Sequence, residues 1–408
     1  MGLAGEASTV AWATVGRAAV ALAVCAACSG GAVAQTRFLP SPEQVVLAPS
    51  SQALGAQAGP LREAERGWRR NPNDLAAAVR YARAAFVMGL NEGDLRWYGT
   101  AKAALLPWWT EPSLSAEGHF LRGLVKQGFH DFAGGLADFN ASLALDADRA
   151  EVWSWRFALH LLQTDLAAAR QDCASMAQRF GPDEGQACEA TLMVRTGQAA
   201  QAVGVFERLV QLAGFQGDGA QRWLRFHQGQ ALWAAGQPAR AQAVLTAHLQ
   251  AQPRDHGARL ALVELLNATG QPADARRWAS VPNPTDALLV QQLLASQVLK
   301  DGTADRLTQA MVQRLAAREQ RGEGLIERPE MVFFIRAAHN VPRGLKLAQD
   351  NWATQQEPVD GALLVEAALL LGQPEAARPV LDWVATTGYT DPVLQPLLAQ
   401  VRQRLGGR

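Results

Sequence analysis

The six residues GQPARA at 236–241 have close copies elsewhere in the chain. GQAAQA lies at 197–202, GQPADA at 270–275 and GQPEAA at 372–377. The first three copies in chain order recur at a spacing of about 34 residues, with a somewhat longer interval after the glycine at 197. Glycine can close a helix in a left-handed conformation, and proline fits the first turn of the next helix because its missing N–H costs nothing there. The copies therefore predict a repeated helix–turn–helix unit.

An alanine lies five residues after each of these glycines, where two helices would cross closely and a larger side chain would hold them apart. The repeat period and this small residue resemble the tetratricopeptide repeat (TPR) family. The resemblance is clearest over 115–282 and weaker over 342–391, and it implies an all-α, right-handed solenoid of antiparallel helix pairs. The predicted turn and packing residues are Gly197, Ala202, Gly236, Ala241, Gly270, Ala275, Gly372 and Ala377.

The composition and the motifs exclude several functional classes. The formal net charge of the 408 residues is zero, so no basic excess attracts nucleic acid. No motif of a hydrolase, a nucleotide-binding protein or a metalloprotease is present. No two of the seven histidines are three or four residues apart, as two ligands on one helical face would be. We therefore expect no enzyme, no cofactor, no metal site and no nucleic-acid partner.

The N-terminal residues resemble an export signal. Arg17 precedes a short apolar run at 18–28, and the small residues at 32–34 form an A-x-A cleavage site. This pattern predicts a signal peptide over 1–34, an extended linker over 35–60 and a periplasmic location. An alternative is a lipoprotein signal, in which Cys28 is acylated and the chain is anchored to a membrane.

Three segments follow the linker in this prediction. Residues 61–282 form a TPR-like solenoid, and residues 342–408 hold further repeats and a capping helix. Residues 283–341 are amphipathic by periodicity but lack the repeat motif. They form either divergent helix pairs within one array or a small helical insert between two arrays.

Cys173 and Cys188 are the two cysteines that remain after cleavage at residue 34. They lie at similar distances on either side of the turn at 179–184, so an antiparallel helix pair would bring them level with each other. In an oxidising compartment such a pair is a disulfide candidate. The alternative is two buried thiols that act as small hydrophobic residues.

A partner-binding groove is the predicted functional site. By family resemblance, the inner face of the first helix in each repeat lines a concave groove. Carried onto the unit at 222, that pattern selects Trp223, Phe226, Gln230 and Trp233, and one repeat later Glu264 and Asn267. Aromatic anchors carry much of the energy of peptide binding. The alternative is that the aromatic stripe is ordinary packing between repeats.

The resemblance implies an exported bacterial TPR protein that acts as a non-catalytic scaffold. It would bind another protein or an extended peptide in the cell envelope, and would contact a membrane only if lipidated at Cys28. A second hypothesis is a structural accessory of an envelope secretion or polysaccharide-export assembly, which would be a lipoprotein if Cys28 is acylated. A third is an enzyme whose helical active site carries no known motif. Repeat motifs report packing, so the identity of the partner does not follow from them.

Overall fold

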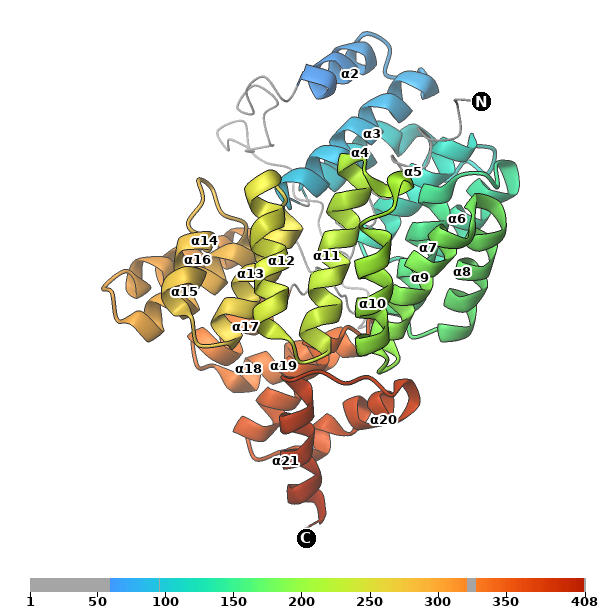
Figure 1. Ribbon diagram of the computed structural model, residues 1–408. Coiled ribbons are helices and arrows are strands. Elements are labelled where there is room, and N and C mark those ends of the chain that lie inside the picture. The colour runs from blue at the N-terminus through green and yellow to red at the C-terminus, as the bar shows by residue number, and fades with distance from the viewer. Residues whose placement is uncertain (1–58, 95, 321–327, 407–408) are drawn as a thin grey trace.

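The computed structural model describes residues 59–94, 96–320 and 328–406, and every regular element in these ranges is a helix (Figure 1). The predicted signal peptide lies outside them. The predicted linker overlaps them only at its last two residues, which begin a helix instead. In chain order the elements are α2 (Gly59–Arg70), α3 (Leu75–Glu92), α4 (Arg96–Leu105), η2 (Leu106–Trp108), α5 (Ala116–Gly128), α6 (Phe132–Leu145), α7 (Ala150–Leu162), α8 (Leu166–Phe180), α9 (Pro182–Arg195), α10 (Ala199–Leu209), η3 (Ala213–Phe215), α11 (Asp218–Ala234), α12 (Pro238–Ala251), α13 (His256–Ala268), α14 (Pro272–Ala279), α15 (Asp286–Leu299), α16 (Ala304–Gln320), α17 (Arg328–Val332), η4 (Phe333–Ala337), α18 (Val341–Trp352), α19 (Pro358–Leu370), η5 (Pro374–Ala377), α20 (Arg378–Thr387) and α21 (Leu394–Gly406).

The pair α11–α12 shows how the repeated motif builds a unit. Gly236 ends the first helix with φ of 72°, the left-handed value that glycine adopts without strain. Pro238 begins the second helix at a position that needs no N–H donor. Where the helices cross, Ala241 is fully buried, and a Cβ on Gly229 would lie 2.8 Å from Leu245. The small residues therefore permit the close crossing.

The same left-handed turn recurs where the sequence has no glycine. Gly197, Gly270 and Gly372 have φ between 65° and 73°. His130 and Thr164, which are one repeat period apart, occupy the equivalent position with φ of 60° and 59°. A left-handed conformation is uncommon for histidine and strained for a β-branched threonine. The backbone period thus extends through two repeats that the glycine motif does not mark.

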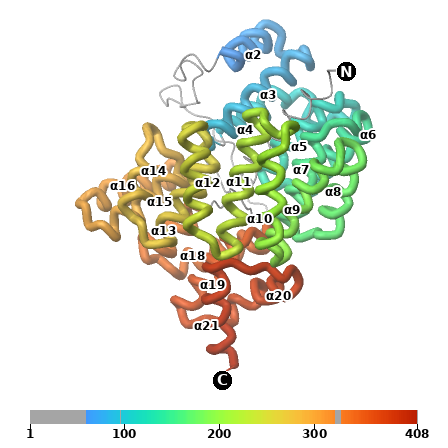
Figure 2. The backbone as a smooth tube through the Cα atoms, in the orientation of Figure 1, coloured from blue at the N-terminus to red at the C-terminus, as the bar shows by residue number. Residues whose placement is uncertain are grey.

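The helices form two layers. The first helices of successive pairs, from α3 to α19, pack against one another along the array, and the second helices pack chiefly against first helices (Figures 1 and 2). The layer of first helices is therefore the inner one. The helices α15, α16 and α17 continue the same stack, because α15 packs on both α13 and α14 and then on α17. Residues 283–320 and 328–341 thus follow the array without a break in its packing.

Ion pairs between the two helices of a unit also follow the repeat period. Arg122 on α5 lies 2.7 Å from Asp138 on α6, and Arg156 on α7 lies 2.5 Å from Asp172 on α8. The two arginines are one repeat period apart, and so are the two aspartates. Burial opposes ionisation of Asp138, but Arg122, Lys126 and His119 outweigh it and hold its pKa below the usual value. These pairs fasten the second helix to the first.

The apolar core is divided along the array. One cluster of buried side chains runs from α2 to α13, a second from α11 to α15, and a third from α15 to α21. The pairs α13–α14 and α15–α16 therefore link two larger cores. Among the described helices, none combines the length and the apolar character that crossing a membrane requires.

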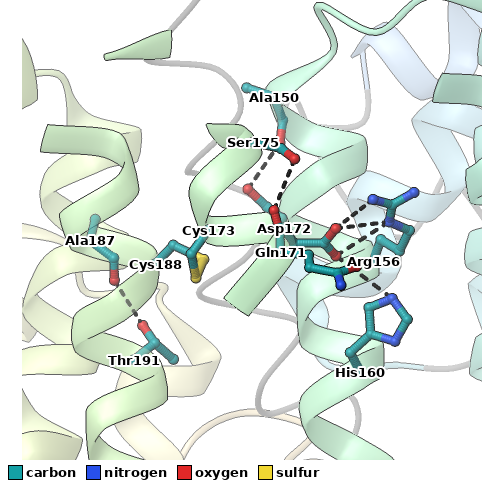
Figure 3. Close-up of a disulfide and its surroundings, with 11 residues drawn as sticks. Ala150, Arg156, His160, Gln171, Asp172, Cys173, Ser175, Ala187, Cys188 and Thr191 are labelled. Carbon is teal, nitrogen blue, oxygen red and sulfur yellow. Dashed lines mark hydrogen bonds and ion pairs between the residues drawn. A yellow bond between two sulfur atoms is a disulfide. The ribbon is translucent and has the colours of Figure 1, made fainter. Parts of the chain in front are cut away.

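A disulfide joins Cys173 on α8 to Cys188 on α9, with the two Cα atoms 5.3 Å apart (Figure 3). It links the second helix of one pair to the first helix of the next. Both cysteines are 1% exposed, so solvent does not reach the sulfurs readily. The bridge closes a short loop, and it stabilises the fold chiefly by constraining the unfolded chain.

The array turns back on itself at two places. The turn after α3 meets the start of α13, where a Cβ on Gly93 would lie 2.5 Å from the ring of His256. Near the C-terminus, α19 and α20 lie against the turns that follow α7 and α9, as Figure 2 shows below α9 and α10. At that second place the backbone N–H of Gln356 donates to the carbonyl of Leu162 over 2.9 Å.

Candidate functional site

Two of the predicted groove residues are core residues. Trp223 and Phe226 are each 1% exposed, and both pack on the ring of His227, with centroid separations of 4.2 Å and 5.2 Å. They fill the space between neighbouring repeats. The prediction that they anchor a partner is therefore wrong, and the alternative of ordinary packing describes them.

The other four predicted residues keep exposed surface on the inner layer. Gln230 and Trp233 lie farther along α11, and Trp233 packs one side of its ring against the first apolar cluster. Glu264 and Asn267 occupy the equivalent positions on α13, one repeat later. The Asn267 amide donates to the side-chain oxygen of Gln291 over 2.8 Å, which ties it to α15.

Two acidic side chains on first helices of the early repeats, Glu117 and Glu151, are paired with arginines. Arg83, Glu117 and Glu151 lie at successive intervals of one repeat period on α3, α5 and α7. The guanidinium of Arg83 contacts Glu117 at 2.7 Å and Glu151 at 2.6 Å, and Arg149 also pairs with Glu117. These carboxylates have little capacity left to recognise a partner.

Glu264 differs from them because it makes no hydrogen bond or ion pair with any side chain or backbone group in the described ranges. Burial raises the pKa of its carboxyl group, and the positive charges of Arg328 and Arg336 only partly offset this effect. These arginines lie on α17 and η4, so Glu264 faces first helices from a later part of the array. A partly exposed carboxylate without a partner among the described residues is therefore available to accept a hydrogen bond from a bound group.

Arg328 and Asp360 form the buried pair next to it. The guanidinium Nε donates to the Asp360 carboxylate over 2.6 Å, and Asp360 is fully buried. Burial disfavours the charge of Arg328, but Asp360, Glu264 and Glu357 outweigh that effect and raise its pKa further. Its Nη2 has no hydrogen-bond partner within the part of the chain that the structure describes. One buried donor of the cluster is therefore unsatisfied among the described residues.

Arg336 and Glu366 form a second ion pair beside the first. Their charged atoms are 2.7 Å apart, and both side chains are partly exposed. Sequence reasoning missed these four residues because the repeat motif marks turns and packing positions and carries no information about ion pairs between units. The only local signal is a charge inside an apolar run, as in MVFFIR at 331–336 and GALLVEAALL at 361–370. The residues that the fold adds to the site are Arg328, Arg336, Asp360 and Glu366.

This arrangement suits recognition of polar groups through the partly exposed Glu264 carboxylate and the partly exposed Arg336–Glu366 pair on facing helices. It contains no nucleophile hydrogen-bonded to a general base, which acyl or phosphoryl transfer through the protein would require. Within the described residues, no group of three or more His, Cys, Asp and Glu side chains could hold a metal ion.

His227 lies on α11 and packs against the rings of Trp223 and Phe226. It is 4% exposed, and burial lowers its pKa to about 3, while a hydrogen bond with Gln230 works in the opposite direction. The imidazole is therefore neutral at physiological pH, and it acts as a packing group beside the inner face.

Comparison with known proteins gives a family for part of the chain. A family model described as tetratricopeptide repeat matches residues 232–297. No curated protein matches the chain. Among solved structures, a tetratricopeptide repeat protein from Parabacteroides merdae is 13% identical, with 71% of this chain and 98% of that chain covered and a TM-score of 0.37. The human IFIT1 dimer with m7Gppp-AAAA is also 13% identical, covers 92% and 94%, and has a TM-score of 0.43.

The Cut9–Hcn1 hetero-tetramer of the APC/C is 13% identical over 85% of this chain and 80% of that one, with a TM-score of 0.40. At these values the solved structures carry no inference about the partners of this chain. The matched segment runs from the end of α11 into α15. Residues 232–297 are therefore a tetratricopeptide repeat segment, and the helix pairs on both sides of it have the same turn geometry.

Proposed function

We propose that the chain is a non-catalytic scaffold of the bacterial cell envelope that binds an extended segment of another protein on its inner helix layer. The observation that carries this proposal is the Glu264 carboxylate, which has no hydrogen-bond or ion-pair partner among the described residues and lies among partly exposed side chains on first helices. A partly buried carboxylate without a partner is unfavourable, and a basic side chain of a bound segment would relieve that cost. Trp233, one repeat earlier, offers an aromatic face to the same segment.

The proposed location rests on the cysteines and the N-terminal sequence. Disulfides persist in oxidising compartments such as the bacterial periplasm and are rare in the cytosol. The Cys173–Cys188 bridge therefore supports export, as do the apolar run and the A-x-A site at the N-terminus. Mass determination of the chain recovered from the envelope distinguishes cleavage after residue 34 from acylation at Cys28.

The test compares three tagged forms of the full chain in the native envelope. The first is unchanged, the second carries Trp233→Ala and Glu264→Ala on the inner layer, and the third carries Gln250→Ala on the exposed side of α12. We expect the unchanged chain and the outer control to retain one specific partner, and the inner variant to lose it. Circular dichroism of all three forms establishes that each remains helical.

A photo-crosslinking amino acid at Gln230 then maps the contact, with the same group at Gln250 as its control. Crosslinks that form from Gln230 alone support the inner layer as the binding face. If the inner variant retains the partner, or if crosslinks form only at Gln250, the inner-face proposal fails. A structural accessory that uses the outer layer then becomes the better hypothesis.

A further inference from the structure

The contact between the C-terminal helices and the turns after α7 and α9 is built differently from the junctions between successive pairs. Its contributors lie far apart in the chain, at 162–197 on one side and 356–388 on the other. The contacts are the backbone hydrogen bond from Gln356 to Leu162, an indole hydrogen bond from Trp383, and an ion pair of Arg195 with Glu357. All three contacts are polar.

The apolar cores on the two sides of this contact are separate. The helices α7 and α9, which precede these turns, belong to the cluster that spans α2 to α13, whereas α19 and α20 belong to the cluster that spans α15 to α21. Successive pairs elsewhere share buried apolar side chains. Parting the two sides at this contact would therefore leave each core intact, because hydrophobic burial holds each side together independently.

Two consecutive repeats supply this surface through equivalent positions. Leu162 and Arg195 each stand two residues before the left-handed turn residue of their repeat, which is Thr164 in one and Gly197 in the next. Gly388 approaches the second turn so closely that a Cβ on Gly197 would lie 2.1 Å from its carbonyl oxygen. The contact is thus matched to two neighbouring turns.

Thr164 is the most informative residue of the contact. Its position is glycine in four repeats, and a β-branched residue is strained at its φ of 59°. Its hydroxyl group, which glycine lacks, accepts the Trp383 indole N–H over 2.9 Å. Thr164 therefore keeps a strained backbone conformation and forms a hydrogen bond with a residue 219 positions away in the sequence.

From these observations we infer that residues 356–388 form a polar clasp, which closes the array over its inner layer and opens as a unit to admit the bound segment. The clasp residues are Leu162, Thr164, Arg195 and Gly197 on the first side and Gln356, Glu357, Trp383 and Gly388 on the second. The admission of a segment rests on the proposed function, whereas the opening itself is a property of the chain alone. Salt weakens the ion pair, so opening increases with ionic strength.

Opening is measured first, without a partner, by amide hydrogen exchange of the purified chain. The Gln356 N–H reports the clasp directly because its acceptor lies across it. Loss of one neutral hydrogen bond in Thr164→Gly should speed its exchange between about 2-fold and 10-fold. Amides within α7 and α8 should be unchanged or slower, because glycine relieves the strain of the turn. Thr164→Ser keeps the hydroxyl and should leave Gln356 exchange near that of the unchanged chain.

Access to the inner layer is measured next, again without a partner. A cysteine introduced by Glu264→Cys is labelled with N-ethylmaleimide or with a bulky polyethylene-glycol maleimide. The Thr164→Gly background should speed labelling by the bulky reagent and leave that by the small reagent unchanged.

Three results would overturn the clasp. The first is exchange of the Gln356 amide that is as slow as that of the most protected core amides and does not change in Thr164→Gly. The second is an equal change of Gln356 exchange in Thr164→Ser and Thr164→Gly. The third is a rate of labelling by the bulky reagent that is the same with and without Thr164→Gly. Loss of partner binding alone would instead count against the proposed function.

Discussion

The four GQ turns share a sequence but differ in their surroundings, and that difference gives a sharp test. We consider Gly197→Ala against its matched control Gly236→Ala. Both glycines have left-handed φ, 73° and 72°. A Cβ on Gly236 meets no atom within 4 Å, whereas one on Gly197 would lie 2.1 Å from the carbonyl oxygen of Gly388.

The two substitutions share one cost and differ in a second. A left-handed alanine costs roughly 1–2 kcal/mol, and Gly236→Ala should lose only that amount of unfolding free energy. In Gly197→Ala the C-terminal helices must also retreat by about 1 Å, and overpacking of this kind costs about 1–3 kcal/mol more. This second cost cannot exceed the free energy that closes the clasp, because opening removes the collision altogether.

Urea unfolding followed by circular dichroism measures the first cost, and hydrogen exchange at Gln356 measures the second. We expect a loss of about 1–2 kcal/mol for the control and about 2–5 kcal/mol for Gly197→Ala, with faster Gln356 exchange only in the latter. Equal losses with equal exchange would show that the turn after α9 and Gly388 are not in contact in solution. The whole account of the closed array would then fall.

Three further outcomes follow from buried groups. His227 has a folded pKa of about 3 against 6.5 unfolded, so the unfolded state gains a proton first, and stability present above pH 6.5 declines as the pH falls towards 3. At pH 5 that loss is about 2 kcal/mol, and His227→Leu should remove this contribution from pH-resolved unfolding curves while leaving that of His130, whose pKa burial also lowers to about 3. Reducing the Cys173–Cys188 bridge should lower the free energy of unfolding by about 3 kcal/mol. In the reduced chain, thiol titration should find both cysteines unreactive until the chain is denatured. Asp360→Ala should cost about 3–5 kcal/mol because it strands a buried guanidinium, whereas Glu375→Ala, on an exposed pair, should stay within about 0.5 kcal/mol by urea unfolding.

The helix pairs could be predicted from the sequence because their determinants are local. A turn glycine, a proline two residues later and an alanine five residues later specify a unit within a few residues, as at Gly236, Pro238 and Ala241. His130 and Thr164 carry no such signal. Tertiary packing imposes a left-handed backbone on them, although neither residue type prefers it. The period is therefore visible in some repeats and hidden in others that fold in the same way.

The candidate site was less accessible to sequence reasoning for two physical reasons. An aromatic stripe has the same spacing whether it faces solvent or a neighbouring repeat, and Trp223 and Phe226 face the repeat. The charged cluster around Glu264 joins helices that are far apart along the chain, with Glu264 on α13 and Asp360 on α19. A helical period places a side chain on a face of its own helix, but it does not specify which distant helix that face meets.

Closure changes how such an array should respond to damage. In an open stack each pair depends only on its neighbours, so the end frays most readily and a mutation acts locally. Here the last pair is also held by the third and fourth, so a substitution at Thr164 should loosen helices at the opposite end of the sequence before it loosens its own. The free energy that closes the clasp is small because its contacts are polar. The clasp can therefore keep the free chain closed and still open when a segment binds. The strain at Thr164 is then the local cost of a connection that the repeat motif alone would not make.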